Sequence, residues 1–130
     1  RRYRLRVHPV EGRMPLFLHG PIAASWLQRE AGVGDEAVLE AVRLHTTGRK
    51  GMGPIAKAVY LADKLDPQKA YRYRWIGQVR ALADASLDRA LLLFLDSSLS
   101  DLGSQRAEVH PDSAELRDHL IVALRPSPKE

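Results

Sequence analysis

The stretch His45-Thr46-Thr47-Gly48-Arg49-Lys50-Gly51-Met52 interrupts the helical pattern of this chain. Residues 46–53 hold three glycines, so we expect a loop that separates one helix from the next. The stretch also places a histidine beside two hydroxyls and a basic turn, and Ala62-Asp63 follows it. Such polar groups are costly to bury without partners, but they suit a metal ion and a phosphate.

The segments on both sides of this loop predict an all-α chain. No segment alternates polar and apolar residues as a strand does, and no Asn-Gly or Asp-Gly hairpin occurs. Helix-start and helix-stop signals predict helices at 21–31, 36–45, 54–64, 74–85, 87–101 and 113–124. We expect residues 1–18 to be irregular and residues 126–130 to form a tail, so that residues 1–130 make one domain.

Prolines and small polar residues mark where these helices begin. Pro21 and Pro54 suit the first helical position, where no amide hydrogen bond is lost. Asp35 is an N-cap residue for the helix that follows it. Asp112, with Glu115 three residues later, predicts a capping box at the start of the last helix.

Composition and charge limit what the chain is expected to do. It has 130 residues, of which 45% are hydrophobic, enough for one compact core. Residues 1–13 account for the net charge of +4. Their only acidic residue is Glu11, and their basic residues are Arg1, Arg2, Arg4, Arg6 and Arg13. Nucleic-acid binding requires positive charge on the folded body, so we do not expect a nucleic-acid partner. With no cysteine, no apolar run of ~18 residues and no secretory signal, we expect a cytoplasmic protein without disulfides or membrane contact.

His45 and Asp63 each continue the apolar face of a predicted helix. His45 continues the face that contains Val38, and Asp63 continues the face that contains Val59. Both side chains are therefore predicted to point inward, where they can converge on one ion. An imidazole nitrogen with a carboxylate oxygen suits iron, manganese, zinc or nickel better than calcium. Taken alone, His45 is more often a core or helix-capping histidine, and Asp63 a partner in a salt bridge.

Two further features fit the same site. His19 precedes a predicted helix in Leu-His-Gly-Pro, either as a third ligand or as a loop histidine beside a helix dipole. The loop 46–53 offers hydroxyls, open amides and two cations ahead of the helix that starts at Pro54. It is therefore either an anion site or an ordinary solvated turn. It lacks the G-x-x-x-x-G-K-[ST] order of a Walker A loop.

In their order along the chain, these motifs resemble the YqeK family of bacterial HD-domain hydrolases, which cleave diadenosine tetraphosphate symmetrically into two molecules of ADP. The family pattern runs Leu-His-Gly, His-Thr-Thr-Gly with a nearby methionine, Ala-Asp, Glu-Pro-x-Arg, His-Pro and Arg-Asn. The counterparts here are Leu18-His19-Gly20, His45-Thr46-Thr47-Gly48 with Met52, Ala62-Asp63, Asp66-Pro67-Gln68-Lys69, His110-Pro111 and Arg117-Asp118. The resemblance covers residues 16–121 and implies an HD-like helical bundle.

The resemblance also assigns roles to particular residues. It implies a two-metal centre in which His19 and His45 are ligands and Asp63 completes the first metal site, so that His45 and Asp63 are catalytic. The two ions are expected to be transition metals, with iron first and manganese, nickel or cobalt as alternatives. The candidates for contacts with a polyphosphate substrate are Thr46, Thr47, Gly48, Arg49, Lys50, Lys57, Lys69 and His110.

Three departures from the family pattern change these expectations. Lysine replaces arginine at Lys69, which keeps the charge but loses the bidentate fork for phosphate. Asp118 replaces an amide near the expected nucleotide pocket. No His-Asp dipeptide, the pair that names the superfamily, occurs in the 130 residues. We therefore expect the helices that carry this pair to lie outside these residues, and the chain on its own to be an inactive part of the enzyme; the alternative is a degenerate homologue that lacks the pair.

The sequence thus predicts a metal-dependent phosphohydrolase that acts on dinucleoside polyphosphates. One alternative is another HD-type hydrolase that acts on a nucleotide monophosphate or an alarmone. The other is a non-catalytic helical module whose arginine-rich N-terminus binds RNA or an acidic partner. Stoichiometric metal in the purified protein would distinguish an enzyme from such a module. The sequence leaves a homodimer open.

Overall fold

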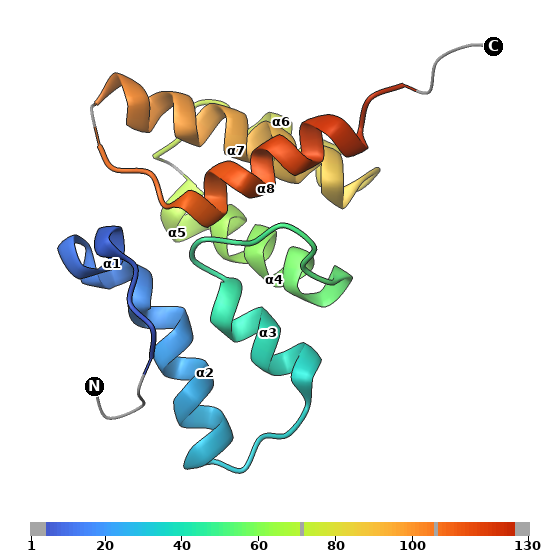
Figure 1. The fold of residues 1–130 in the computed structure, drawn as a ribbon. Helices are drawn as coiled ribbons and strands as arrows, with labels where there is room; N and C mark the ends of the chain where they lie inside the picture. The colour runs from blue at the N-terminus through green and yellow to red at the C-terminus, as the bar shows by residue number, and fades with distance from the viewer. Residues whose placement is uncertain (1–4, 71, 106, 127–130) are drawn as a thin grey trace.

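The computed structural model describes residues 5–70, 72–105 and 107–126, and within these ranges the secondary structure is entirely helical (Figure 1). The all-α prediction is therefore confirmed. In chain order the elements are α1 (Pro9–Arg13), the 3-10 helix η1 (Pro15–Leu18), α2 (His19–Arg29), α3 (Glu36–Leu44), α4 (Pro54–Leu65), α5 (Pro67–Ala70), α6 (Ile76–Ala83), α7 (Leu87–Ser104) and α8 (Pro111–Ala123).

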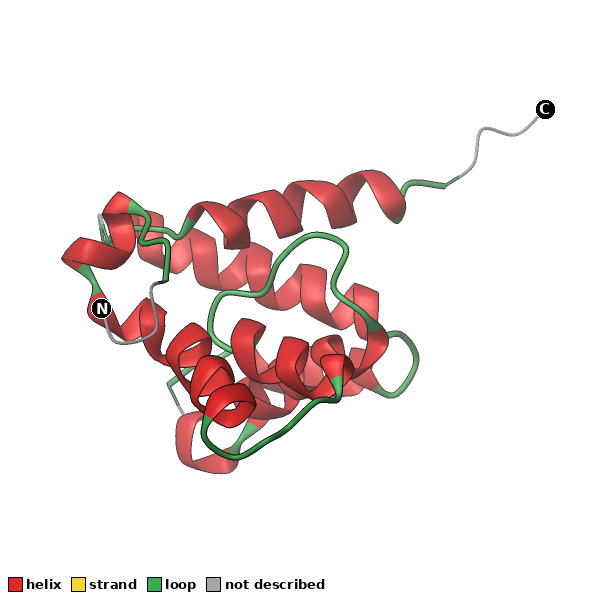
Figure 2. Ribbon diagram, turned by 60° about the horizontal axis from the view of Figure 1, so that its bottom comes forward, coloured by secondary structure: helices red, strands yellow, loops and turns green. Residues whose placement is uncertain are grey.

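The helices pack in two groups that share α4. α2 and α3 form a hairpin at the lower end of Figure 1, and α4 packs against α3. α7 is the central helix of the other group, in contact with α4, α6 and α8. Figure 2 shows the long loop between α3 and α4 extending toward α8. This loop is the 46–53 stretch, and it remains non-helical as predicted.

The hydrophobic core lies where α4, α7 and α8 meet. Leu61, Leu91, Leu95, Leu116 and Leu120 are each at most 2% exposed. Burying one such leucine stabilises the fold by roughly 1.5–3 kcal/mol, so this cluster anchors the molecule. The contribution of α2 is smaller, since its buried positions are a glycine and an alanine.

The predicted helices agree with the structure to within three residues at each end, but three short elements were not predicted. The expectation that residues 1–18 are irregular is wrong for the described part, because it contains α1 and η1. Pro9 and Pro15 stand at the first positions of these two helices, where their fixed φ favours helix initiation. α5 is also absent from the predicted helices, although Pro67 stands at its first position. Asp66 Oδ1 accepts a hydrogen bond from the Gln68 amide at 3.0 Å and so begins a new turn.

α8 begins two residues earlier than predicted and has a different cap. His110 is its N-cap residue, and His110 Nδ1 accepts a hydrogen bond from the Asp112 amide at 3.1 Å. The predicted capping box of Asp112 and Glu115 is therefore wrong, because Asp112 already lies within the first turn. A second imidazole cap occurs at α1, where His8 Nδ1 accepts from the amide two residues later at 3.2 Å. A neutral imidazole supplies the lone pair that such a cap needs.

The inward faces predicted for α3 and α4 are only partly correct. Val38 is 42% exposed and Val59 is 39% exposed, so neither belongs to the core. The buried residues of α3 are Leu39, Ala41 and Leu44. α3 packs against both α2 and α4, and its apolar surface is therefore not the single stripe on which the prediction was based.

α2 approaches α3 closely at Gly20. A Cβ atom there would lie 2.5 Å from the Arg43 carbonyl oxygen and 2.9 Å from the Val42 carbonyl oxygen. Glycine is therefore required for this contact, which brings the start of α2, and with it His19, to the end of α3.

Some predicted features lie beyond what the structure describes. The tail residues 127–130 and the arginines Arg1, Arg2 and Arg4 are outside the described ranges. Of the remaining arginines of the basic segment, Arg13 pairs with Glu108 at 2.7 Å. Within the described part of the chain, no helix has both the length and the apolar character needed to cross a membrane.

Candidate functional site

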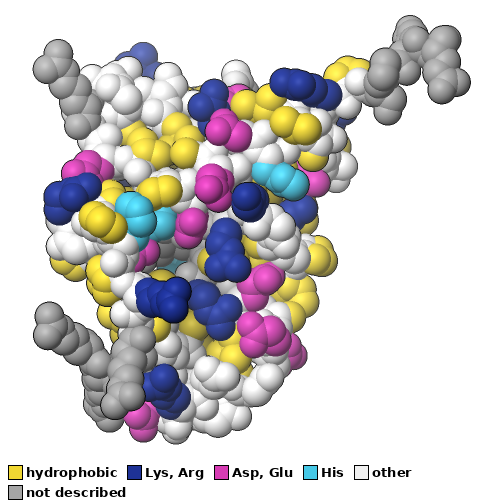
Figure 3. Space-filling model, viewed as in Figure 1, with side chains coloured by type: hydrophobic (Ala, Val, Ile, Leu, Met, Phe, Trp, Pro, Cys, Tyr) yellow, Lys and Arg dark blue, Asp and Glu magenta, His cyan; other side chains and the backbone are white. Residues whose placement is uncertain are grey.

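The three predicted metal ligands, His19, His45 and Asp63, line one cleft of about 520 Å³. The cleft lies where η1 and the start of α2 meet the ends of α3 and α4 and the turn after α5. It is lined by Leu16, His19, His45, Thr46, Asp63, Lys64, Lys69, Arg72 and Tyr73. Figure 3 shows basic side chains gathered across the middle of one face, with acidic and histidine side chains beside them.

His45 is oriented by the backbone of its own helix. It is the C-cap residue of α3, and its Nδ1 lies 2.6 Å from the Val42 carbonyl oxygen. A carbonyl oxygen only accepts, so Nδ1 carries the hydrogen and the Nε2 of the neutral ring keeps its lone pair. A carbonyl behind Nδ1 is a common arrangement for a metal-binding histidine. The His19 ring stands nearly edge-on to His45, with the centroids 5.5 Å apart. His45 is thus a capping histidine that is also able to act as a ligand.

Asp63 is held by two lysines. Lys69 Nζ donates to Oδ1 at 2.6 Å, and Lys64 Nζ donates to Oδ2 at 3.3 Å. Burial alone would raise the pKa of Asp63, but the hydrogen bond from Lys69 and the charge of Lys64 outweigh it, so the pKa lies below its usual value. The carboxylate is therefore ionised, as a metal ligand must be. It forms the salt bridge that the sequence left open as the alternative to a metal role.

Lys64 was not predicted as a site residue, yet it is central to the cleft. Its ammonium lies 4.8 Å from the centroid of the Tyr60 ring and donates to the Thr46 carbonyl at 3.4 Å. Burial lowers the pKa of Lys64, and the neighbouring Asp63 charge opposes that shift. Lys64 therefore ties α4 to the first residue of the loop 46–53.

The donor set fits a divalent transition metal only in part. Two imidazole rings and a carboxylate on one cleft have the donor chemistry that such ions prefer. Among the residues that the structure describes, however, no three His, Asp or Glu side chains lie close enough together to hold an ion. The Asp63 carboxylate is also occupied by its two lysines. A complete metal centre at this cleft therefore needs a shift of Asp63 or donors beyond these three.

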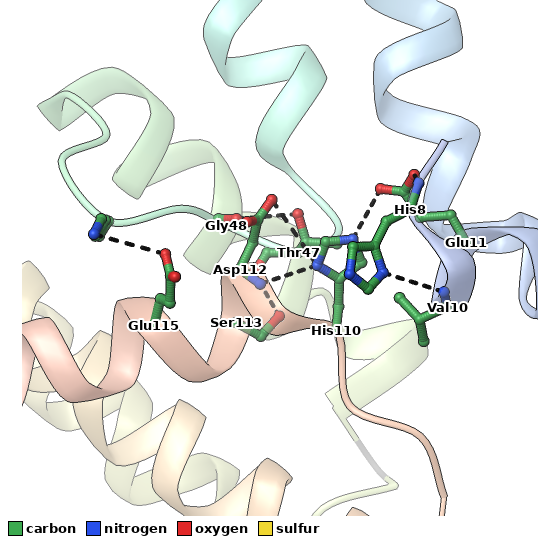
Figure 4. Close-up of polar contacts among 10 residues, drawn as sticks. His8, Val10, Glu11, Thr47, Gly48, His110, Asp112, Ser113 and Glu115 are labelled. Atoms are coloured by element: carbon green, nitrogen blue, oxygen red, sulfur yellow. Dashed lines mark hydrogen bonds and ion pairs between the residues drawn. The ribbon is translucent and has the colours of Figure 1, made fainter. Parts of the chain in front are cut away.

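The loop that follows His45 is anchored to α8 (Figure 4). Ser113 Oγ donates to the Thr47 carbonyl at 2.7 Å, and Thr47 Oγ1 donates to the Gly48 carbonyl at 3.0 Å. Gly48 has a φ of +65°, and a Cβ atom there would lie 2.7 Å from Leu116 Cδ2. Thr47 and Gly48 therefore position the loop, while Thr46 alone of the three lines the cleft.

The other cations predicted to bind phosphate lie away from the cleft. Arg49 and Lys50 are exposed and border a separate hollow of about 50 Å³. Lys50 forms a long ion pair with Glu115 at 3.8 Å. Lys57 pairs with Asp88 at 2.8 Å, between α4 and the start of α7. None of these three cations lines the cleft.

His110 uses both ring nitrogens inside the protein (Figure 4). Because Nδ1 accepts from the Asp112 amide, the hydrogen of the neutral ring is on Nε2, which donates to Glu11 Oε1 at 2.9 Å. The side chain is 4% exposed, and its ring packs edge-on against Phe17 at 5.2 Å. His110 therefore joins α8 to the N-terminal segment, and both of its nitrogens are already engaged.

A smaller inner pocket of about 150 Å³ adjoins the cleft. The two cavities share Thr46, Lys64 and Tyr73. Burial raises the pKa of Tyr60, with Tyr73 and Asp63 adding to the shift, so its phenol is neutral. The other apolar and aromatic side chains of the inner pocket are Phe17, Phe94, Leu95, Leu99 and Leu102.

Four lining residues of the cleft were not predicted from the sequence: Leu16, Lys64, Arg72 and Tyr73. Lys64 had a detectable signal, because it follows Asp63 directly and a cation is the expected partner of a half-buried carboxylate. Arg72 and Tyr73 lie outside the helices, so no helical spacing relates them to Lys69. Leu16 had no signal, since its segment was expected to be irregular.

The fold is that of an HD superfamily hydrolase. The crystal structure of a predicted HD superfamily hydrolase involved in NAD metabolism from Clostridium acetobutylicum superposes with a TM-score of 0.84 at 28% sequence identity. The match covers 92% of this chain and 62% of that one. The HD-like helical bundle expected from the motifs is therefore confirmed.

Curated relatives carry a more specific name. The symmetrical bis(5'-nucleosyl)-tetraphosphatase of Bacillus subtilis is 38% identical over 99 residues, which are 76% of this chain and 52% of the relative. The protein of the same name from Halalkalibacterium halodurans is 31% identical over 106 residues, 82% of this chain and 56% of the relative. No family model matches. The resemblance inferred from the motifs is thus confirmed, and the chain spans about half the length of the curated relatives it matches.

Proposed function

We propose that this cleft is the phosphate-binding part of a metal-dependent hydrolase that splits dinucleoside tetraphosphates symmetrically, giving ADP from diadenosine tetraphosphate. The observation that supports the proposal most directly is the presence of His19, His45, Asp63 and Lys69 on one cleft. The relatives named symmetrical tetraphosphatases support the substrate and the position of cleavage.

The metal ligands proposed here are His19, His45 and Asp63. His45 offers Nε2, because its Nδ1 donates to a backbone carbonyl. When bound, divalent metal ions supply Lewis-acid polarisation of phosphoryl oxygens and a more acidic coordinated water. We expect transition metals, iron first, because imidazole with carboxylate is their usual donor set.

The remaining polar residues of the cleft are proposed to hold the polyphosphate chain. Lys69 reaches Asp63 from a half-exposed position, so its ammonium is accessible to an incoming anion. Lys64 lies deeper, with only 17% of its side chain exposed. Together they offset charge on the substrate, and Thr46 adds a hydroxyl at the same cleft. Thr47, Gly48 and His110 act indirectly in this proposal, by fixing the loop and the wall beside it.

Two lysines with different locations allow a matched test of the phosphate role. Lys69 lines the cleft, whereas Lys50 pairs with Glu115 outside it. Lys69→Ala should weaken ADP binding to the 130-residue chain by about 1–3 kcal/mol, the scale of a charge-assisted hydrogen bond. The loss should shrink at high salt, because the group is half-exposed. Lys50→Ala should leave binding unchanged, and Lys69→Arg should tighten it by restoring a bidentate donor. Unchanged affinity in both Lys69 variants would remove this residue from the site.

The reaction is tested by product analysis on the protein expressed from its complete gene. With a divalent metal and diadenosine tetraphosphate, anion-exchange chromatography should show ADP as the product. AMP together with ATP would indicate asymmetric cleavage and contradict the proposal. Consumption of a nucleotide monophosphate or an alarmone, but not of diadenosine tetraphosphate, would favour another HD-type hydrolase. Absence of bound metal and of any turnover would favour a binding module.

A further inference from the structure

We propose that a groove on α7 is the contact surface for a second copy of this chain, with the two α7 helices packed antiparallel about a two-fold axis. The groove has a volume of about 320 Å³, and none of the described residues that line it also lines the cleft or the inner pocket. Its lining residues are Leu82, Arg89, Leu92, Leu93, Asp96 and Leu124. The proposal therefore concerns assembly and is independent of the proposed function.

Four half-buried leucines form the apolar part of the groove. Leu92 and Leu93 are on α7, Leu82 is on α6, and Leu124 is the C-cap residue of α8. Because α6 and α8 both pack on α7, leucines from all three helices meet at one place. Covering their exposed surface with another apolar surface is favourable. An apolar centre of this kind is typical of the middle of a subunit interface.

Arg89 and Asp96 flank the leucines of α7 with opposite charges. They are seven residues apart, about two helical turns, so both lie on the face that carries Leu92 and Leu93. Both are exposed. Within the described part of the chain, only the backbone amide of Arg89 forms a hydrogen bond outside its helix, and its guanidinium forms none. Asp96 Oδ1 accepts from Arg117 Nε at 2.6 Å, which fixes the carboxylate without using Oδ2.

The order of these four residues on α7 is self-complementary. Arg89 and Asp96 are equally distant from the midpoint between Leu92 and Leu93. A two-fold axis through this midpoint, perpendicular to α7, places Arg89 of each copy opposite the partner's Asp96 and Leu92 opposite the partner's Leu93. Two parallel helices would instead place like charges opposite each other, which is unfavourable. The groove thus supplies both halves of its own match, which favours a second copy as its occupant.

The test is the oligomeric state of the protein expressed from its complete gene. Sedimentation equilibrium up to about 1 mM, which detects even a weak interface, should show a dimer. Arg89→Asp should raise the dissociation constant of the dimer about tenfold or more, because a two-fold interface contains the altered pair twice. Arg49→Asp makes the same change in charge at an exposed residue outside the groove and should leave the dissociation constant unchanged.

Exchanging the two charges distinguishes direct pairing from a general effect of net charge. The double variant Arg89→Asp with Asp96→Arg again places unlike charges opposite each other and should regain most of the lost affinity. If it is folded by circular dichroism yet dimerises no better than Arg89→Asp alone, the antiparallel pairing is overturned. A dimer that Arg89→Asp does not weaken is held together elsewhere and also overturns it. An unchanged protein that stays monomeric leaves the groove to a different partner and overturns the proposal outright.

A second measurement needs no variant. In an equal mixture of isotope-labelled and unlabelled protein, nuclear Overhauser effects between copies should connect the methyl groups of Leu92 with those of the partner's Leu93. Effects that instead involve Ile22 or Val122, which are exposed and do not line the groove, would place the interface on another surface and overturn the proposal.

Discussion

Gly20→Ala should destabilise the fold, although alanine is the better helix former. The Cβ atom would lie 2.5 Å from the Arg43 carbonyl oxygen, where ordinary contacts begin at 3.4 Å. The second close neighbour is the Val42 carbonyl oxygen at 2.9 Å. Because both neighbours are backbone atoms, α2 itself must move away from α3. Forced separation of packed elements costs about 1–3 kcal/mol. The gain in helix propensity is at most about 1 kcal/mol, so the steric cost outweighs it.

Gly77→Ala is a close control for this substitution. Gly77 is the second residue of α6, as Gly20 is of α2. A Cβ atom at Gly77 would meet nothing within 4 Å. The free energy of unfolding should therefore rise by up to about 1 kcal/mol in Gly77→Ala and fall by about 1–2 kcal/mol in Gly20→Ala. Urea titrations followed by circular dichroism give both values. If Gly20→Ala is as stable as Gly77→Ala, the close approach of α2 to α3 is refuted.

The same substitution has a second readout at the cleft. The Val42 carbonyl oxygen would lie 2.9 Å from the new methyl group and is the acceptor for His45 Nδ1. Displacement of this carbonyl should change the environment of the imidazole, and the His45 ring resonances should shift in the Gly20→Ala spectrum. The exposed His119 on α8 should keep its chemical shifts and provides an internal reference.

Three further predictions concern other parts of the molecule. Glu11→Ala leaves the buried His110 Nε2 without its acceptor and should lower the free energy of unfolding by about 1–3 kcal/mol. Glu11→Gln keeps an acceptor and should lose less stability. Equal losses in the two variants would contradict the hydrogen bond between His110 and Glu11. Gly48→Ala combines a positive φ with a clash against α8 and should cost about 1–3 kcal/mol in a thermal melt, whereas an unchanged melting temperature would argue against the loop conformation. His45→Ala in the complete gene product should abolish turnover and reduce bound metal, measured by elemental analysis, while His119→Ala should retain both.

The helical architecture was largely predictable because local signals mark it. Asp35 and Pro54 start helices where the residue rules place them. The missed elements α1, η1 and α5 do begin with local signals at Pro9, Pro15 and Asp66, but the role of His110 depends also on a contact between distant residues. His110 caps α8 while its other nitrogen pairs with Glu11, ninety-nine residues away in sequence. No local pattern identifies such a pair.

The candidate site was predicted in composition but not in extent. The local motifs identified His45, Asp63 and Lys69, and the fold places these three residues on one cleft, as the resemblance implied. Arg49 and Lys50 share the same loop but lie elsewhere, because the turn at residues 48–51 directs the chain away from the cleft after Thr46. The direction of a glycine turn depends on the sign of φ, which residue type alone does not specify.

The attachment of the loop 46–53 to α8 makes the C-terminal helix part of the site's support, although none of its residues lines the cleft. Ser113 holds the Thr47 carbonyl, and Gly48 fits against Leu116. A truncation before Pro111 would keep every proposed metal ligand and both cleft lysines, yet it would release the loop in which Thr46 follows His45. Boundaries chosen from the proposed metal ligands and cleft lysines alone would therefore produce a protein with all of its candidate ligands and no fixed arrangement of them.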